Sequence, residues 1–546
     1  MNVHSYDVII VGGGGSGIAS ALFLNQAFPN IKIAILCKTY PMGSHTTSAK
    51  GGINAALGNI NQDSTAWHTY DTLTSGKGLC DSIPTTKMCT EAPSIIDYLS
   101  RIGVNFDTTP EGKIDQRVYG GQTTHYGNGE LSNRACFVKD HTGHAIMQSL
   151  CKHVLNQKNI TVFNYTQALD FLYGKPNILL AYNIVNSAID VLQAKYIIFA
   201  TGGFSQIYKT NSSSHLYTGC GHRILFQNGI CLKDIELVQF HPTGLWGNGM
   251  LISEACRSQG AFLRNTKGER FMEKYHHLKE LAPRDVVARA IYQELLYGNV
   301  YLDLTHIPLD TIRKKLISSY TVAKHFAKID ISKSLLPIHP TAHYNMGGIA
   351  VDENYKIKDG IYAIGELACA SVHGANRLGC NSLLELFTSA KIATNDIASN
   401  FQDNKYNSKH NTKKISEAIK SITNKNSGIK FEEILAYRRQ IQEIMDVNAS
   451  IVKNHKNMKM ALNKIDNIYR ELENLNNFSG IAFDVDFINL YETQSLALMA
   501  KCVLTASIFR EHSIGSHYRE DFPQESAKPQ HTEIDNNFHV KYIDVT

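Results

Sequence analysis

The sequence predicts an α/β protein with a Rossmann-like dinucleotide-binding domain, interrupted by an α+β capping domain and followed by a C-terminal helical domain. Three observations predict this fold. A glycine-rich turn joins an apolar strand to a helix near the amino terminus, two more apolar strands end in glycine turns, and helical periodicity dominates only late in the chain. The 546 residues are too many for one hydrophobic core, so we expect several folding units.

The first unit begins with a βαβ pattern. Residues 6–11 are a continuous apolar run, typical of a strand buried on both faces, and residues 18–24 and 31–36 follow as a helix and a second strand. Residues 196–200 and 360–364 are further strands of the same kind, and each ends in a glycine turn. Because ligands bind beyond the carboxyl ends of strands in open α/β sheets, these segments should converge on one ligand.

The rest of the chain divides by composition. Charged and histidine-containing motifs between the second and third glycine turns suggest an inserted domain, and the residues after 400 are rich in Asn, Lys and Ser, as in a solvated linker. Apolar residues then recur at helical spacing. The predicted units are the nucleotide-binding domain (1–238 and 344–400), the capping domain (239–343), a linker (401–428), a helical domain (429–511) and a polar tail (512–546).

The composition is that of an ordinary folded protein. Hydrophobic residues make up 43% of the chain and charged residues 19%, and a net charge of +5 is too small to indicate nucleic-acid binding. No apolar run reaches the roughly 18 residues of a membrane span, and the start carries no basic presequence. The 11 cysteines include no CxxC pair, so we expect reduced thiols, no metal site and no iron–sulfur ligands in this chain.

Gly12, Gly14 and Gly17 have the GxGxxG spacing after a strand and before a helix. The first permits a tight turn, the second lets backbone amides approach a pyrophosphate, and the third lets the helix pack closely. A standard NAD site also needs an acidic ribose ligand at the end of the second strand, where Lys38 follows Cys37 instead. FAD is therefore the favoured dinucleotide.

Nine segments, in order along the chain, resemble the flavoprotein subunit of succinate dehydrogenase and fumarate reductase. This family belongs to a superfamily of FAD-dependent oxidoreductases that also contains L-aspartate oxidase. The resemblance extends from residue 6 to about residue 523. The matching segments are 44–52, 120–122, 140–144, 200–203, 239–244, 253–257, 283–287, 340–348 and 373–379.

The resemblance implies an FAD that is covalently attached. On its own, His45 would be interpreted as a loop histidine. The quinone-linked members of the family carry at this position the histidine bonded to the flavin 8α carbon, whereas L-aspartate oxidases have none there and an acidic residue in place of Gln122. The other cofactor residues implied are Gly12, Gly14, Gly15, Gly17, Lys38, Ser44, Thr46, Lys50, Gly51, Gly52, Gly202, Cys220, Glu366, Ser382 and Leu383.

The resemblance also implies a dicarboxylate site. Each candidate, taken alone, would be a buried histidine satisfied by the backbone or a structural arginine. The family places on the substrate the positions of His241, Ser253, His343 and Arg377. Arg284 matches the residue that exchanges a proton with substrate C3, and because arginine is a poor base it needs a relay, for which Glu254 and Arg257 match the family's proton path.

The activity implied is the interconversion of succinate and fumarate, by hydride transfer between substrate C2 and flavin N5. It would serve the tricarboxylic acid cycle and electron transport. Since this chain carries no cluster ligands, electrons would reach a quinone through an iron–sulfur subunit on membrane anchor subunits, and the chain would be peripheral on the cytoplasmic side of the inner membrane. Two alternatives remain open: a soluble L-aspartate oxidase of NAD biosynthesis, to which residues 280–285 are close, and a degenerate FAD-binding protein.

Four positions depart from the family pattern. Lys50 replaces a Gln or Glu near flavin N5, where a cation is expected to raise the flavin potential or alter the direction of turnover. Cys220 replaces an acidic residue near the cofactor, and Cys380 replaces a glycine. Gly43 stands where an arginine usually precedes the Ser-His pair. Lys50 and Cys220 motivate the degenerate alternative.

Overall fold

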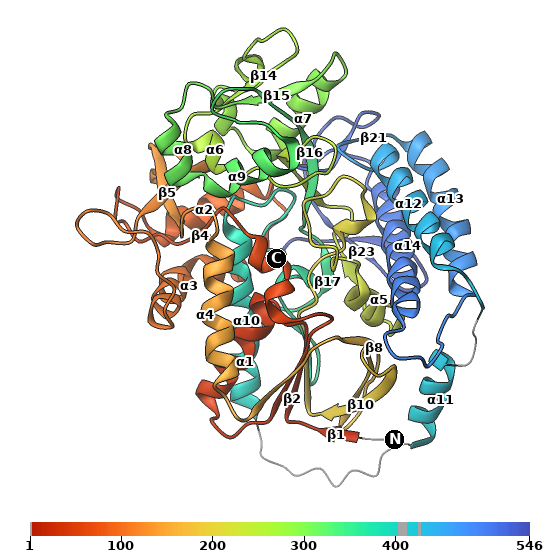
Figure 1. Cartoon of the computed structure of the whole chain (residues 1–546). Helices are drawn as coiled ribbons and strands as arrows, with labels where there is room; N and C mark the ends of the chain where they lie inside the picture. Colours follow the sequence, from red (N-terminus) through yellow and green to blue (C-terminus); the bar gives the residue numbers. More distant parts are fainter. Residues whose placement is uncertain (1–2, 402–411, 424–426) are drawn as a thin grey trace.

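Figure 1 shows a computed structural model of the protein, which describes residues 3–401, 412–423 and 427–546. A capping domain lies over one end of the sheet-containing part, and a bundle of helices runs along its side (Figure 1). The bundle consists of α12 (Phe431–Asn448), α13 (His455–Glu473) and α14 (Val485–Phe509).

The nucleotide-binding domain is built on a six-stranded sheet in the order β18-β19-β11-β2-β3-β7, parallel except for β18. All residues of β2, β3 and β11 are buried, as their continuous apolar sequences predict. Because β2, β11 and β19 are neighbours, their glycine turns meet at one edge, as expected. The strands are β2 (Val8–Val11), β3 (Ile33–Leu36), β7 (Ile160–Phe163), β11 (Tyr196–Phe199), β18 (Lys356–Lys358) and β19 (Ile361–Ala363).

Two helices that begin at this edge pack on each other and on the sheet. The first is α1 (Gly15–Ala27), which starts within the glycine turn after β2, and the second is α10 (Asn381–Asn400). Between the predicted strands the chain also forms α4 (Thr142–Leu155), which packs against α1. Backbone amides of helix starts therefore point toward the edge where the glycine turns meet.

A second sheet of this domain has the order β1-β10-β9-β8. Against it lies α11 (Thr412–Thr423), whose Ile415 is buried with Ile178, Leu180 and Val191. The prediction of a solvated linker over 401–428 is therefore wrong for this helix, because its apolar face finds a sheet to cover. Much of the predicted linker lies outside the described residues. The strands are β1 (Val3–Ser5), β8 (Thr166–Leu172), β9 (Asn177–Asn183) and β10 (Ala188–Ala194).

The capping domain has a sheet of its own, in the order β13-β16-β15-β14. Two of its strands carry the chain into and out of the cap, and an apolar cluster that is separate from the main core fills its interior. The strands are β13 (Val238–Leu245), β14 (Phe262–Arg264), β15 (Val300–Asp303) and β16 (Leu336–Asn345), and the principal helices are α7 (Arg284–Leu295), α8 (Leu309–Lys315) and α9 (Ile317–Val322).

The carboxyl-terminal segment differs from the expected polar tail. Strands β23 (His531–Ile534) and β24 (Val540–Ile543) join a sheet of the nucleotide-binding domain through β12 (Leu232–Lys233). Buried polar residues attach this segment to the domain. Such contacts cannot be predicted from the spacing of apolar residues. None of the helices within the described ranges combines the length and the apolar character that crossing a bilayer requires.

Candidate active site

The glycine turn after β2 is shaped for a dinucleotide. A Cβ atom on Gly12 would lie 2.2 Å from the Ala200 carbonyl oxygen, and one on Gly17 would lie 1.9 Å from the Gly12 carbonyl oxygen. Gly12 also has φ +118, in the region that favours glycine. A Cβ on Gly14 would have no contact closer than 3.6 Å, so this position leaves room beside the start of α1.

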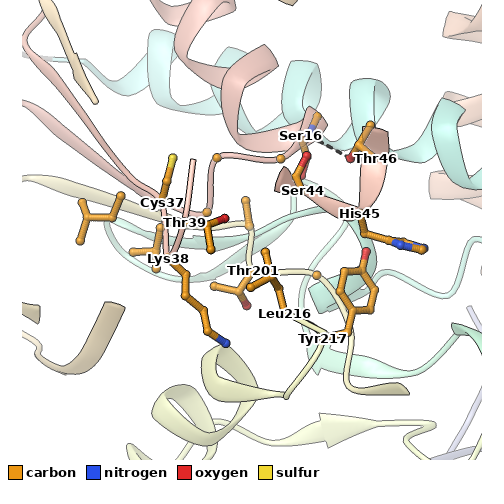
Figure 2. A pocket seen from close by; sticks show the side chains of 18 of the residues that line it. Ser16, Cys37, Lys38, Thr39, Ser44, His45, Thr46, Thr201, Leu216 and Tyr217 are labelled. Carbon is orange, nitrogen blue, oxygen red and sulfur yellow. Dashed lines mark hydrogen bonds between the residues drawn. The ribbon is translucent and has the colours of Figure 1, made fainter. Parts of the chain in front are cut away.

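Figure 2 shows the cavity beside this turn, with His45 and Tyr217 at one end and Cys37 and Lys38 at the other. The hydroxyl of Thr46 accepts a hydrogen bond from the Gly15 amide at 3.1 Å. The hydroxyls of Ser44 and Thr201 are buried without a partner. Unpaired buried hydroxyls are costly unless a ligand satisfies them, so this cavity fits a polar cofactor.

His45 lies where this cavity adjoins a second one. Its Nδ1 accepts a hydrogen bond from the Ser214 amide at 3.2 Å, and its ring packs against Tyr217 with centroids 4.6 Å apart. Burial lowers the pKa of His45 to about 4, so the imidazole is neutral at pH 7. With Nδ1 used as an acceptor, the neutral ring carries its proton on Nε2, which is left to donate.

Glu366 follows β19, between the two cavities. Its carboxyl accepts hydrogen bonds from the Asn345 amide at 3.0 Å and from the Tyr217 hydroxyl at 3.1 Å. Burial raises the pKa of Glu366 to about 8.

Gly202, with φ +71, faces the Tyr217 ring. Cys220 starts α5 (Cys220–Gln227), and its thiol lies 3.2 Å from the Thr218 hydroxyl.

The second cavity has a volume of about 890 Å³ and lies between the nucleotide-binding domain, the cap and α12. The sheet of the cap contributes His241 and His343, whose ring centroids are 5.0 Å apart. His241 Nδ1 accepts from the Thr243 amide at 3.2 Å, and His343 Nδ1 lies 2.8 Å from the Ser212 hydroxyl. Each ring therefore keeps Nε2 free of these contacts.

Arg377 is a buried cation without a carboxylate partner among the described residues. It is 2% exposed, its Nε has no acceptor, and its guanidinium carbon lies 4.5 Å from the centroid of the Tyr344 ring. Burial and the neighbouring Arg284 lower the pKa of Arg377 to about 10, so it remains charged at pH 7. An uncompensated buried charge is strongly unfavourable, and an anionic ligand in the cavity would relieve it.

Arg284 begins α7 and faces the same cavity. Its Nε donates to Glu254 at 2.8 Å, its Nη2 lies 2.6 Å from the same carboxylate, and its Nη1 donates to Gln239 at 3.1 Å. On the other side Arg257 lies 3.4 Å from Glu254, behind the cavity wall. Burial would raise the pKa of Glu254, but Arg284 and Arg257 bring it below its usual value. These three residues form a continuous charged chain.

The other predicted residues surround this centre. Ser253 lines the cavity and its hydroxyl accepts from the Ala255 amide at 3.2 Å. Lys50 reaches the cap, where its amine donates to the Leu251 carbonyl at 2.9 Å. Cys380 precedes α10 with φ +68. Also on the wall are Gly51, Gly52, Ser382 and Leu383.

Gln122, which was expected to distinguish this chain from the L-aspartate oxidases, lies away from the cavity. It is fully buried and donates to Asn54 and to the Gly379 carbonyl. In contrast, Gln239, Tyr217 and Tyr344 take part in the site although no role was predicted for them. Gln239 and Tyr344 stand inside matched motifs and could have been found there, whereas nothing around Tyr217 signalled its contact with His45.

Two family models match the chain. The first, described as an FAD binding domain, covers residues 7–383, and the second, described as the C-terminal part of the fumarate reductase flavoprotein, covers residues 438–545. The chain belongs to the succinate dehydrogenase and fumarate reductase flavoprotein family. This membership confirms the predicted resemblance and the FAD cofactor, and it makes the chain an FAD-dependent oxidoreductase of this type.

Relatives of this family match almost the whole chain. The succinate dehydrogenase flavoprotein subunit of Rickettsia bellii is 36% identical over 97% of this chain and 92% of its own length. The mitochondrial succinate dehydrogenase [ubiquinone] flavoprotein subunit of Oryza sativa is 34% identical over 95% of this chain and 86% of its own. The match therefore includes both the FAD-binding part and the C-terminal part.

Solved structures show the same architecture. A point mutant of the FrdA subunit of E. coli quinol fumarate reductase superposes with a TM-score of 0.91 at 29% identity, over 100% of this chain and 97% of that one. The Mycobacterium smegmatis Sdh1 complex with UQ1 gives a TM-score of 0.83 at 28% identity, over 100% and 94%. The predicted fold class, an interrupted FAD-binding domain followed by helices, is confirmed.

Proposed function

We propose that this protein is the catalytic subunit that interconverts succinate and fumarate. The observation that carries this proposal is Arg377, a buried guanidinium to which no described residue offers a carboxylate partner. It faces His241 and His343 in a cavity adjoining His45. A four-carbon dicarboxylate would supply the missing negative charge. The names of the relatives, which are succinate dehydrogenases and fumarate reductases, support the same substrate pair.

The residues of the cavity can orient and polarise such a substrate. Burial and the neighbouring arginines hold the pKa values of His241 and His343 well below the usual range, so both rings are neutral. His241, whose Nδ1 accepts from the Thr243 amide, can donate from Nε2 to a carboxylate, and His343 can do so when the Ser212 hydroxyl donates to its Nδ1. Arg377 can bind the same diacid through its planar fork. A monocarboxylate would leave buried donors unpaired, which gives selectivity.

Proton transfer is assigned to Arg284. FAD, when bound, would accept or supply a hydride at its N5 atom. Arg284 would hold the proton that is exchanged with substrate C3, as the acid when fumarate is reduced and as the base when succinate is oxidised. Because arginine releases protons reluctantly, Glu254 and Arg257 are proposed as the relay on its far side.

We further propose that His45 carries the flavin covalently and that electrons leave to an iron–sulfur partner and a quinone. Because Nδ1 accepts from the Ser214 amide, the neutral ring carries its proton on Nε2, which would lose that proton on bonding to the flavin 8α carbon while the flavin takes up the two electrons. Residues Gly12, Gly14, Gly15, Lys38, Ser44, Thr46 and Gly202 would hold the rest of the cofactor. The chain would attach to the cytoplasmic side of a membrane through its partners.

The proposed activity is tested with Arg284→Gln. Removing the group that takes the substrate C3 proton should lower succinate oxidation with an artificial dye by roughly 10²–10⁴-fold, as for other general acids and bases, while the flavin remains bound. Absorbance of the purified protein measures the bound flavin. Activity close to that of the parent would remove the role of Arg284.

Two further measurements separate the alternatives. L-Aspartate turnover with oxygen in place of succinate oxidation would identify an oxidase, and the absence of both activities would identify a degenerate protein. For the covalent bond, the protein is unfolded in acid. Yellow colour should stay with the polypeptide of the parent and pass to the supernatant for His45→Ser. Colour released from the parent would contradict the bond.

A further inference from the structure

Lys38 occupies the position where a dinucleotide-binding strand usually ends in an acidic ribose ligand. It lines the cofactor cavity directly after β3, and Figure 2 shows its side chain extending away from Cys37. Its amine lies 3.2 Å from the Thr218 hydroxyl and forms an ion pair with Glu492. An ammonium group has three protons, so one remains for an acceptor in the cavity.

Glu492 comes from the opposite part of the molecule. It lies on α14 of the helical bundle, 7% exposed, and its second oxygen accepts from Arg438 of α12 at 2.7 Å. Burial would raise the pKa of Glu492, but Lys38 and Arg438 bring it below the usual value, so the carboxylate is charged. One buried anion is thus shared by two cations from two domains.

The two cations line different cavities. Lys38 belongs to the wall of the cavity beside the glycine turn, whereas Arg438 belongs to the wall of the cavity that contains His241 and Arg377. Glu492 itself lines neither. Its position therefore matters to a ligand only through the residues that it holds.

We propose that Glu492 is a positioning residue for the cofactor: it fixes Lys38 so that the amine donates to an oxygen of the adenosine half of FAD, and it thereby makes tight FAD binding depend on docking of the helical bundle. The ion pair fixes the orientation of the amine, so that its remaining proton becomes a directed donor. Without Glu492, Lys38 and Arg438 are partly buried cations without their shared partner. This role does not depend on which substrate is oxidised.

The test uses the full chain with His45→Ser, so that FAD binds reversibly. In this background Glu492→Gln should weaken FAD binding by about tenfold, as expected for loss of a hydrogen bond to a charged group. Lys38→Met should weaken it comparably. Because the two changes disrupt the same interaction, their effects should not add. The double variant should bind FAD no more weakly than whichever single variant binds it less tightly. Quenching of flavin fluorescence measures the dissociation constant.

Glu473→Gln is the matched control. Glu473 on α13 pairs with Arg223 of α5 at 2.9 Å across the same junction, but it lines neither of the two cavities. The Glu473→Gln change should lower the thermal unfolding temperature of the FAD-free and FAD-bound forms alike and leave the dissociation constant for FAD unchanged. Unchanged or tighter FAD binding in Glu492→Gln, an equal loss in the control, or additive losses in the double variant would each overturn the proposal.

Discussion

Lys50 is a partly buried lysine in the wall of the cavity that also holds Arg377. Its amine has the Leu251 carbonyl as an acceptor, and Asp140 and Cys256 lie near enough to affect it. Burial lowers the pKa of Lys50 from its ordinary value, although Asp140 opposes the shift. A positive charge here would favour the electron-rich reduced form of a bound flavin.

We therefore expect Lys50→Gln to lower the midpoint potential of the flavin, measured by spectroelectrochemical titration. The difference from the parent should shrink as pH rises through the lowered pKa of Lys50, because the parent then loses its charge. Lys209→Gln is the control, since Lys209 is exposed at the outer rim and pairs with Glu443. Equal potentials for the parent and Lys50→Gln below neutral pH would exclude this effect.

Glu366 predicts a pH dependence of stability in the FAD-free protein. Its folded pKa of about 8 lies above the unfolded value of 4.5, so the folded state holds a proton that the unfolded state has lost between these pH values. Stability must then fall as pH rises over this interval. The free energy of unfolding of Glu366→Gln, relative to that of the parent, should be higher at pH 9 than at pH 5 by up to a few kcal/mol. Each unit of pKa difference corresponds to about 1.4 kcal/mol. Urea unfolding at both pH values measures this, and an equal difference at both would contradict it.

At the scale of elements, β23 is held by charge as well as by its ladder. His531 Nδ1 lies 2.6 Å from Asp234, and Nε2 lies 3.3 Å from Asp81. Burial alone would lower the pKa of His531, but the two carboxylates raise it above its ordinary value. The C-terminal strands are thereby attached to β12 by a pair that strengthens when the histidine is protonated.

Because the folded pKa of His531 is raised, its stabilisation is present below the unfolded value of about 6.5 and is lost as pH rises through the folded pKa. Protection factors for hydrogen exchange in β23 and β24, which remove the intrinsic increase of exchange with pH, should fall over that range. His531→Asn should show low protection at all pH values, whereas His539→Asn, an exposed neighbour whose partner among the described residues is Asp535, should behave as the parent. Protection factors of the parent that do not change with pH would refute the switch.

For the whole molecule, the cap and the nucleotide-binding domain are joined by polar contacts around the cavity. Asp140, just before α4, accepts hydrogen bonds from the amides of Ser318 and Ser319 at the start of α9. Lys50 and Leu251 form a second link nearby. These bonds help to hold the cap over the cavity.

Asp140→Asn should weaken this closure, because an amide accepts less strongly than a carboxylate and its charge no longer faces the helix start. We expect the KM for succinate to rise roughly tenfold and kcat to change less. Asp330→Asn is the control, since Asp330 caps only a local turn of the cap. An unchanged KM would show that Asp140 does not hold the cap.

Much of the fold could be predicted because its signals are local. The apolar strands before each glycine turn and the helical spacing after residue 428 appear at their expected places. The linker and the tail were predicted wrongly in part because α11 and β23 are stabilised by distant partners. The site residues could be proposed from motifs, but the contacts of Tyr217 and Glu492 could not.

The amino-acid sequence by itself determined the glycine turns, the buried strands that precede them and the identity of the charged residues. Only the tertiary structure decided which charges find partners: Lys38 meets Glu492 of a distant helix, whereas Arg377 meets no carboxylate in the part of the chain that the structure describes. The reason is physical. Backbone conformation follows from neighbouring residues, but the energy of a buried charge depends on what chain folding brings within a few ångströms of it.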